Sequence, residues 1–325
     1  MPLLEINDLT LEFGSGPDAT RVVDGVSLTV EAGETLCLVG ESGCGKSVTA
    51  LSVARLVRSP PARYPRGAIR INGRDVLKMS KSELREVRGR LVSYVFQEPG
   101  ASLNPVFRIG TQIKENLRLH RPEAATDEEV VRLLKQVGIP APEIRARSYP
   151  HELSGGMQQR AMIAMALASR AKLLIADEPT TALDVTIQAQ IIELLRDLKR
   201  EFGTSILLIT HNLGIVGDIA DRVAVMYAGQ IVELAPAHEL LRRPQHPYTR
   251  ALIRSVPSLG ATPERLVAIP GAVPIPNALP SGCRFHPRCP EVREDCSRQA
   301  PALSEVGSGR LVRCPYWDAN SEVRS

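Results

Sequence analysis

The sequence has no long hydrophobic run. Of its 325 residues, 43% are hydrophobic, but no stretch approaches the about 18 consecutive apolar residues that a membrane-spanning helix requires. The first residues, MPLLEINDLT, lack the charged segment, apolar core and small-residue cleavage site of a signal peptide. We therefore expect a cytosolic protein that reaches a membrane only through a partner.

The sequence also has little excess charge and few aromatic residues. Its 40 Lys and Arg against 36 Asp and Glu leave a net charge of +4, which is too small over this length to attract nucleic acid. We interpret the basic stretch from Arg63 to Arg90 as a solvated face. With 23% charged and 4% aromatic residues and no heptad repeat, the composition excludes fibrous, coiled-coil and disordered classes.

What is present is an alternation of apolar runs and helical patterns. The apolar runs lie at residues 34–40, 91–96, 172–178 and 205–210, and segments with helical patterns lie at 46–57, 158–170 and 186–202. Strands that alternate with helices in this way predict an α/β fold with a mainly parallel sheet.

Two regions depart from this pattern and suggest how the chain is organised. Residues 98–150 contain Pro and Gly punctuation around helical stretches such as 127–137, and 13 of the 25 prolines fall in the last 90 residues. We expect a first domain over residues 1–235, with a helical subdomain at about 98–165, and a loop-rich second domain over residues 236–325.

Residues 40–47, GESGCGKS, match the phosphate-loop pattern G-x-x-x-x-G-K-S/T between a predicted strand and a predicted helix. Glycines let backbone N–H groups turn toward an anion, Lys46 can reach the β- and γ-phosphates, and the Ser47 hydroxyl can bind Mg²⁺. The sequence thus predicts that ATP is bound by Gly40, Ser42, Gly43, Cys44, Gly45, Lys46, Ser47 and Val48.

A pair of carboxylates follows the apolar run at 173–177. Asp177 ends this predicted strand, where it can hold Mg²⁺ through water, and Glu178 comes next. A carboxylate that directly follows the Mg²⁺-binding aspartate can polarise the water that attacks the γ-phosphate. We predict that Glu178 is the general base of ATP hydrolysis.

Residues 153–160, LSGGMQQR, place a hydroxyl and two glycines directly before a helical segment. A capped helix start explains this pattern, and so does a second anion site built from bare N–H groups. A second anion site beside a complete phosphate loop suggests an ATP held between two subunits.

With these motifs in this order, residues 1–235 resemble the ATP-binding subunit of ABC transporters, a P-loop NTPase fold. The resemblance implies that Gln97 lies in the Q-loop and joins Ser47 and Asp177 around Mg²⁺, that Asp184 belongs to a D-loop formed by 181–184, and that His211 senses the γ-phosphate. It implies a signature motif that covers the partner's ATP and consists of Ser154, Gly155, Gly156, Met157 and Gln158.

Three positions fit this family less tightly. Met157 stands where the signature usually has Gln, and Asn212 follows His211 where many relatives have Asp; we expect both differences to be tolerated. Phe13 stands near the position of the aromatic residue that stacks on adenine, and a core position explains it equally well.

The six cysteines form two groups. Cys37 lies within an apolar run and is interpreted as a core residue, and Cys44 occupies a variable position of the phosphate loop. The other four have the spacing C-x₅-C-x₆-C-x₁₇-C and are Cys283, Cys289, Cys296 and Cys314. Four thiolates in a reducing compartment suit zinc or an iron–sulfur cluster, but the spacing matches neither the usual zinc nor the usual ferredoxin pattern.

The C-terminal region narrows the resemblance. HPYTRAL at 246–252 and GCRFHPRCP at 282–290 resemble the C-terminal region of the dipeptide and oligopeptide branch of ABC importers. This resemblance implies a 4Fe–4S cluster on the four cysteines and ATP hydrolysis that powers peptide uptake at the cytoplasmic face of the membrane. The implied partners are a paralogous second ATPase subunit, two membrane permease subunits and, indirectly, an extracytoplasmic peptide-binding protein, without nucleic acid.

Other functions stay open at this point. Within the same branch, nickel, glutathione or another small solute is an alternative cargo. Outside it, the chain is compatible with a non-transport ABC ATPase or with a regulatory cassette that binds ATP without turnover. The presence of both Glu178 and His211 favours hydrolysis.

Overall fold

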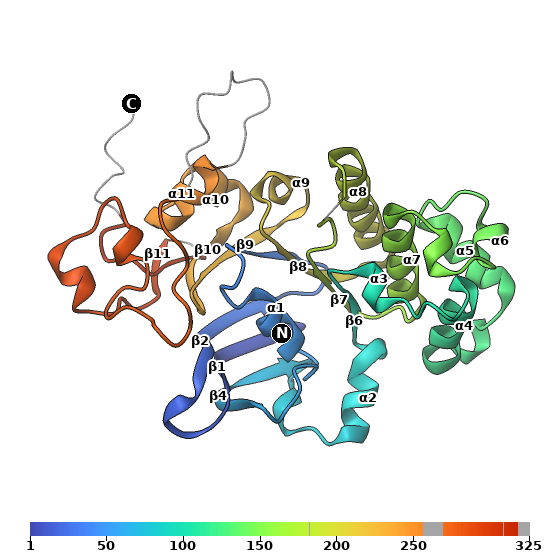
Figure 1. Ribbon diagram of the computed structural model, residues 1–325, viewed down its shortest axis with the longest axis horizontal. Coiled ribbons are helices and arrows are strands. Elements are labelled where there is room, and N and C mark those ends of the chain that lie inside the picture. Colours follow the sequence, from blue (N-terminus) through green and yellow to red (C-terminus); the bar gives the residue numbers. More distant parts are fainter. Residues whose placement is uncertain (182, 256–268, 308, 318–325) are drawn as a thin grey trace. The chain divides into compact units, whose positions relative to one another are not determined.

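Figure 1 shows the computed structural model of the chain, which describes residues 1–181, 183–255, 269–307 and 309–317. The chain divides into two compact units. The first consists of Met1–Thr29, Thr35–Leu77 and Thr210–Ser325, and the second of Val30–Glu34 and Lys78–Ile209.

An antiparallel sheet is formed by the N-terminal segments of the first unit. Its strand order is β2 (Thr20–Val30), β1 (Leu4–Phe13), β4 (Ala62–Ile71), β5 (Arg74–Asp75). Leu4 lies opposite Ile71 and Ile6 opposite Ile69, and all four side chains are buried. Such buried cross-strand pairs stabilise a sheet. The sequence predicted strands at the N-terminus but not this separate sheet.

A second sheet of the first unit carries the phosphate loop. Its strands follow the order β11 (Ser304–Gly307), β12 (Arg310–Val312), β10 (Gln230–Pro236), β9 (Arg222–Tyr227), β3 (Thr35–Val39). β3 and β9 are parallel, and the others pair antiparallel. Asp221 fixes the start of β3, because its carboxylate accepts a hydrogen bond of 2.7 Å from the Thr35 N–H.

The helices of the first unit are short. They are α1 (Lys46–Ser52), α9 (Val216–Ile219), α10 (Ala237–Arg242) and α11 (Pro247–Arg254). α1 ends five residues before the predicted end at 57, and Arg55 then adopts a left-handed φ of +51°, which breaks the helical path. Between 269 and 317 the described chain is mostly loop, with 3₁₀ turns at His286–Arg288 and Glu294–Ser297.

The second unit contains three parallel strands. Their order is β8 (Ser205–Thr210), β7 (Leu173–Asp177), β6 (Val92–Val95). Every residue of β7 and β8 is buried, as expected for parallel strands covered on both faces. All three strands were predicted at these places.

The second unit also contains seven α-helices among its described residues (Figure 1). They are α2 (Lys81–Arg90), α3 (Pro99–Ser102), α4 (Ile109–His120), α5 (Asp127–Gln136), α6 (Pro142–Arg145), α7 (Gly155–Ala168) and α8 (Val185–Phe202). α3, α4 and α5 pack against α7, which is apolar on more than one face and therefore suited to a position among other helices.

The mixed architecture of helices and strands confirms the predicted α/β fold class. The expectation of a mainly parallel sheet is wrong for the described strands: the parallel pairs are β3–β9, β6–β7 and β7–β8, and the pairs in the antiparallel sheet and around β10 and β12 outnumber them. No helix in the described part of the chain is long and apolar enough to cross a membrane.

Candidate functional site

The predicted nucleotide residues divide between the two units. The phosphate loop, Phe13 and His211 belong to the first unit, and Gln97, the signature segment and Asp177 to the second. Ala182 of the predicted D-loop lies outside the described residues.

The phosphate loop begins where the buried strand β3 ends. Gly40 has a φ of +153°, and a Cβ at this position would lie 2.2 Å from the carbonyl oxygen of Met226. No other residue fits so close to a backbone. Gly45 is the N-cap of α1 and is buried, so the loop closes directly onto the helix.

Lys46 places a buried cation against this loop. Its side chain is 4% exposed, and Nζ donates hydrogen bonds to the carbonyl oxygens of Gly40 at 2.8 Å and Glu41 at 3.0 Å. Ser42 and Gly43 are exposed, and Ser47 and Val48 are half-buried on the first turn of α1. The loop can therefore offer an ammonium, a hydroxyl and backbone N–H groups to a phosphate.

Cys44 and Phe13 have different surroundings. Cys44 is 1% exposed, and burial raises the pKa of its thiol, which makes it a poor nucleophile. Phe13 is half-buried at the last position of β1, opposite Ala62 of β4.

Of the two carboxylates at the end of β7, Glu178 has a strained backbone conformation. Asp177 is 7% exposed, and Glu178 has a φ of +46°, which is unusual for a residue with a side chain. The Glu178 N–H donates to the carbonyl oxygen of Ile209 at 2.9 Å. This bond fixes the turn that carries both carboxylates.

The Glu178 carboxylate accepts two hydrogen bonds. Oε2 accepts one of 2.8 Å from the Thr181 hydroxyl and one of 3.3 Å from the side-chain amide of Gln97. The structure thus brings together two residues that are 81 positions apart. A half-buried carboxylate with a fixed orientation is suited to take a proton from water.

The signature segment and the D-loop share one construction. Ser154 is the N-cap of α7 and accepts from the Met157 N–H, and Asp184 is the N-cap of α8 and accepts from the Ile187 N–H. Side-chain caps of this kind satisfy N–H groups at a helix start.

A glutamine four residues after each cap holds the preceding loop. Gln158 donates to the carbonyl oxygens of Pro150 and Leu153, and Gln188 donates to those of Thr180 and Leu183. Sequence reasoning missed Gln188, although its spacing from Asp184 repeats that of Gln158 from Ser154.

His211 follows β8 and is exposed. The next residue, Asn212, uses its side-chain oxygen to accept the N–H of Gly214 at 2.9 Å. An aspartate oxygen can accept the same bond, so this local contact does not depend on having Asn rather than Asp here.

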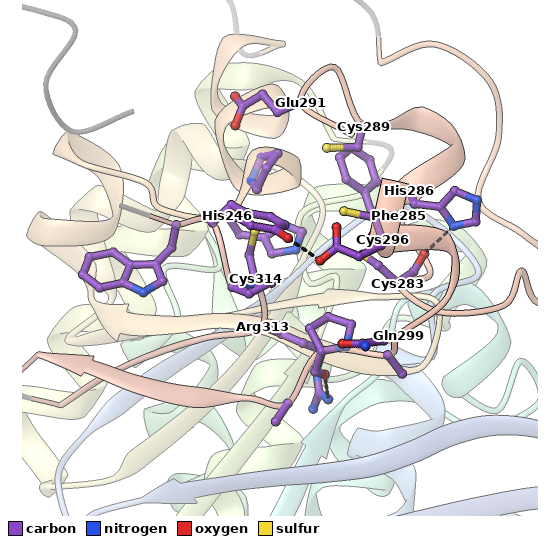
Figure 2. A pocket seen from close by; sticks show the side chains of 18 of the residues that line it. His246, Cys283, Phe285, His286, Cys289, Glu291, Cys296, Gln299, Arg313 and Cys314 are labelled. Atoms are coloured by element: carbon purple, nitrogen blue, oxygen red, sulfur yellow. Dashed lines mark hydrogen bonds between the residues drawn. The ribbon is translucent and has the colours of Figure 1, made fainter. Parts of the chain in front are cut away.

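The four C-terminal cysteines line one cavity of about 350 Å³ together with His246, Phe285 and His286. Figure 2 shows their side chains around this cavity. Burial, together with the neighbouring Glu291, Cys283 and Cys314, raises the pKa of Cys289 to about 11. Burial and the other cysteines likewise raise the pKa values of Cys283 and Cys314.

The cavity does not by itself define a metal centre. Among the residues that the structure describes, no three or more His, Cys, Asp or Glu side chains are grouped so that they could hold a metal ion. The predicted 4Fe–4S cluster and its zinc alternative are therefore not established by this geometry.

Family models match both parts of the chain. Residues 23–181 match the model described as "ABC transporter", and residues 232–296 match that described as "Oligopeptide/dipeptide transporter, C-terminal region".

Two curated relatives align along nearly the whole chain. The oligopeptide transport ATP-binding protein AppD of Bacillus subtilis is 49% identical over 325 residues, which cover 99% of each chain. The dipeptide transport ATP-binding protein DppD of Escherichia coli is 46% identical over 318 residues, which cover 97% of each chain.

Solved ABC cassettes have the same fold. The dimeric cassette MJ0796 in a post-hydrolysis state with ADP and Pi matches with a TM-score of 0.64 and 25% identity, over 72% of this chain and 98% of that chain. The cbiO1 structure from Clostridium perfringens gives the same TM-score with 26% identity, over 74% and 91% of the two chains.

The phosphate loop and these matches define an ATPase of the ABC class, as the sequence predicted. More particularly, the chain belongs to the family of ATP-binding proteins of ABC transporters.

Proposed function

We propose that this ATPase powers the uptake of dipeptides or oligopeptides as the ATP-hydrolysing subunit of an ABC importer. The observation that carries the proposal is the match of residues 232–296 to a C-terminal region described for oligopeptide and dipeptide transporters. The similarity of the whole chain to AppD and DppD supports it.

The residues described above have the chemistry that hydrolysis needs. In this proposal Lys46 binds the β- and γ-phosphates, and Ser47, Asp177 and Gln97 hold Mg²⁺, which would neutralise phosphate charge. Glu178 takes a proton from the attacking water, and its bonds from Thr181 and Gln97 keep the carboxylate oriented. His211 senses the γ-phosphate.

We assign the remaining site residues to contacts with a nucleotide that lies between two subunits. The segment of the signature motif from Ser154 to Gln158 would cover an ATP bound by a paralogous ATPase subunit, with Asp184 at the same boundary. The exposed N-terminus of α7 supports this role, because its N–H groups can bind an anion. We assign Phe13 to the adenine side of the loop.

We further propose two domains: residues 1–235 as the nucleotide-binding domain, with a helical subdomain at about 98–165, and residues 236–325 as a C-terminal domain. The helical subdomain would contact two permease subunits at the cytoplasmic face of the membrane. These permeases would receive peptide from an extracytoplasmic binding protein.

We propose that Cys283, Cys289, Cys296 and Cys314 hold a 4Fe–4S cluster, with zinc as the alternative. The cavity that all four cysteines line supports this assignment. When bound, such a centre would cross-link loops that have little secondary structure of their own, a structural role that small loop-rich segments need.

Uptake by the complete importer tests the proposed cargo. Proteoliposomes that contain this chain, the second ATPase and both permeases would be supplied with binding protein and labelled dipeptide, Ni²⁺ or glutathione. We expect ATP-dependent accumulation of the dipeptide. Accumulation of Ni²⁺ or glutathione in its place would overturn the peptide assignment and leave the ATPase assignment intact.

A further inference from the structure

Glu41, the second residue of the phosphate loop, is held through all three of its polar groups. Its N–H donates to the Tyr248 hydroxyl at 2.9 Å. Its carbonyl oxygen accepts from Lys46 Nζ at 3.0 Å. Its carboxylate accepts two bonds from Arg288, of 2.8 Å from Nη1 and 3.0 Å from Nη2. Two of these three partners come from the C-terminal region, more than 200 positions away.

Arg288 is itself firmly positioned. Its side chain is 6% exposed, against 31% for Glu41. Nε donates to the carbonyl oxygen of Pro270 at 2.7 Å, and Nη1 also donates to the Tyr227 hydroxyl at 3.3 Å. A buried arginine that binds a carboxylate in two-pronged fashion fixes the orientation of its partner as well as its distance.

Tyr248 reaches the loop from a packed aromatic cluster. It is fully buried on α11, and its ring lies 4.7 Å from that of Tyr227 and 5.3 Å from that of Phe285, measured between centroids. A tyrosine held by such packing places its hydroxyl precisely.

The same segments line the cysteine cavity. His246 and Pro247, which precede Tyr248, line it, as do Phe285 and Cys289, the latter directly after Arg288. The walls of the cavity and the supports of the phosphate loop are thus built from adjacent residues of one region of the first unit.

From this arrangement we propose that Arg288 and Tyr248 are positioning residues of the nucleotide site, through which the C-terminal region sets the conformation of the phosphate loop and its affinity for nucleotide. The inference rests on the proposed binding of nucleotide phosphates by this loop. It does not depend on peptide transport or on a metal in the cavity.

The test is a double-mutant cycle on nucleotide binding by the full-length chain. The probe is a fluorescent ADP with Mg²⁺, because its binding needs no hydrolysis. We expect Arg288→Ala and Glu41→Gln each to weaken ADP binding about three- to tenfold. Because the two substitutions remove the same interaction, we expect the double variant to bind ADP no more weakly than the single variant with the lower affinity. We expect Arg288→Lys to recover only part of the loss, because Lys cannot form the two-pronged contact.

Arg250→Ala is the matched control. Arg250 pairs with Glu291, two residues after Cys289, so it anchors the same loop without contacting the phosphate loop. We expect Arg250→Ala to bind ADP with an affinity within twofold of that of the unmodified chain. Thermal unfolding of each variant shows whether the chain is folded. If Arg288→Ala does not fold, Glu41→Gln still tests the contact, because the Glu41 side chain is more exposed than that of Arg288.

Three results would overturn the proposal: unchanged affinity in folded Arg288→Ala, an equal loss in Arg250→Ala, or losses in the two single variants that multiply in the double variant. Lys46→Ala distinguishes this failure from that of the proposed function. If Lys46→Ala also leaves ADP binding unchanged, the loop itself is not the phosphate site.

Discussion

The side-chain amide of Gln97 donates a hydrogen bond of 3.3 Å to Oε2 of Glu178. Gln97 follows β6 and Glu178 follows the neighbouring parallel strand β7, so the two side chains meet at the carboxyl ends of adjacent strands. Ligands and catalytic groups of α/β sheets gather at this edge.

This contact predicts a specific defect in Gln97→Ala. Loss of one hydrogen bond that orients the carboxylate should lower kcat for ATP hydrolysis about three- to tenfold. Steady-state ATPase assays measure the change. Gln190→Ala is the control, because Gln190 is exposed on α8 and bonds only to Arg160 among the contacts described; equal loss in both variants would contradict the orienting role.

The close approach of Gly40 to the Met226 carbonyl predicts that Gly40→Ala destabilises the fold. The added Cβ would require displacement of backbone, and we expect the free energy of unfolding in urea to fall by about 2 kcal/mol or more.

Gly43→Ala is the matched comparison for this variant. Gly43 also has a positive φ, of +80°, but nothing lies within 4 Å of the position that a Cβ would take. We expect only the conformational cost of about 1 kcal/mol. Equal destabilisation of the two variants would show that the contact with Met226 contributes nothing.

The two hydrogen bonds of Gln188 predict a role in holding the D-loop. Gln188→Ala leaves the carbonyl oxygens of Thr180 and Leu183 without this donor, and should lower the free energy of unfolding by about 1–2 kcal/mol. Chemical denaturation of this variant and of Gln190→Ala, for which we expect a change within about 0.5 kcal/mol, provides the measurement. A larger effect of Gln190→Ala would be inconsistent with this role.

The proposed cluster predicts bound iron and sulfide in protein that is purified without oxygen. A 4Fe–4S cluster corresponds to about four iron and four sulfide per chain, with visible absorption. We expect Cys289→Ser to lose this iron and sulfide. We expect Cys37→Ala to keep them, because Cys37 is buried within β3 and distant in sequence from the cavity-lining cysteines. Iron, sulfide and zinc analysis measures these contents. One zinc per chain in place of iron and sulfide would show that the site binds zinc and not a cluster. Absence of iron, sulfide and zinc would exclude the metal assignment.

Local patterns made much of this structure predictable. The phosphate loop, the strand before Asp177 and the helix after Ser154 depend on neighbours within a few residues, and the structure confirms the elements at these places. The helix from Lys46 was predicted too long, because no residue signals that Arg55 takes a left-handed conformation.

Contacts over long separations were not predictable in the same way. Arg288 and Glu41 are 247 positions apart, and neither belongs to a pattern that would pair them. The mutual position of Gln97 and Glu178 likewise depends on the register of β6 and β7. Such contacts follow from the packing of whole elements, which one sequence does not reveal.

ATP turnover by the reconstituted importer tests the central claim most directly. The complex of this chain with the proposed partners, a paralogous ATPase subunit and two permease subunits, would be assayed with binding protein, with and without peptide. We predict that peptide-loaded binding protein stimulates turnover, and that Glu178→Gln lowers it about 100-fold or more while nucleotide still binds. Turnover that ignores peptide, or that is unchanged in Glu178→Gln, would contradict the account.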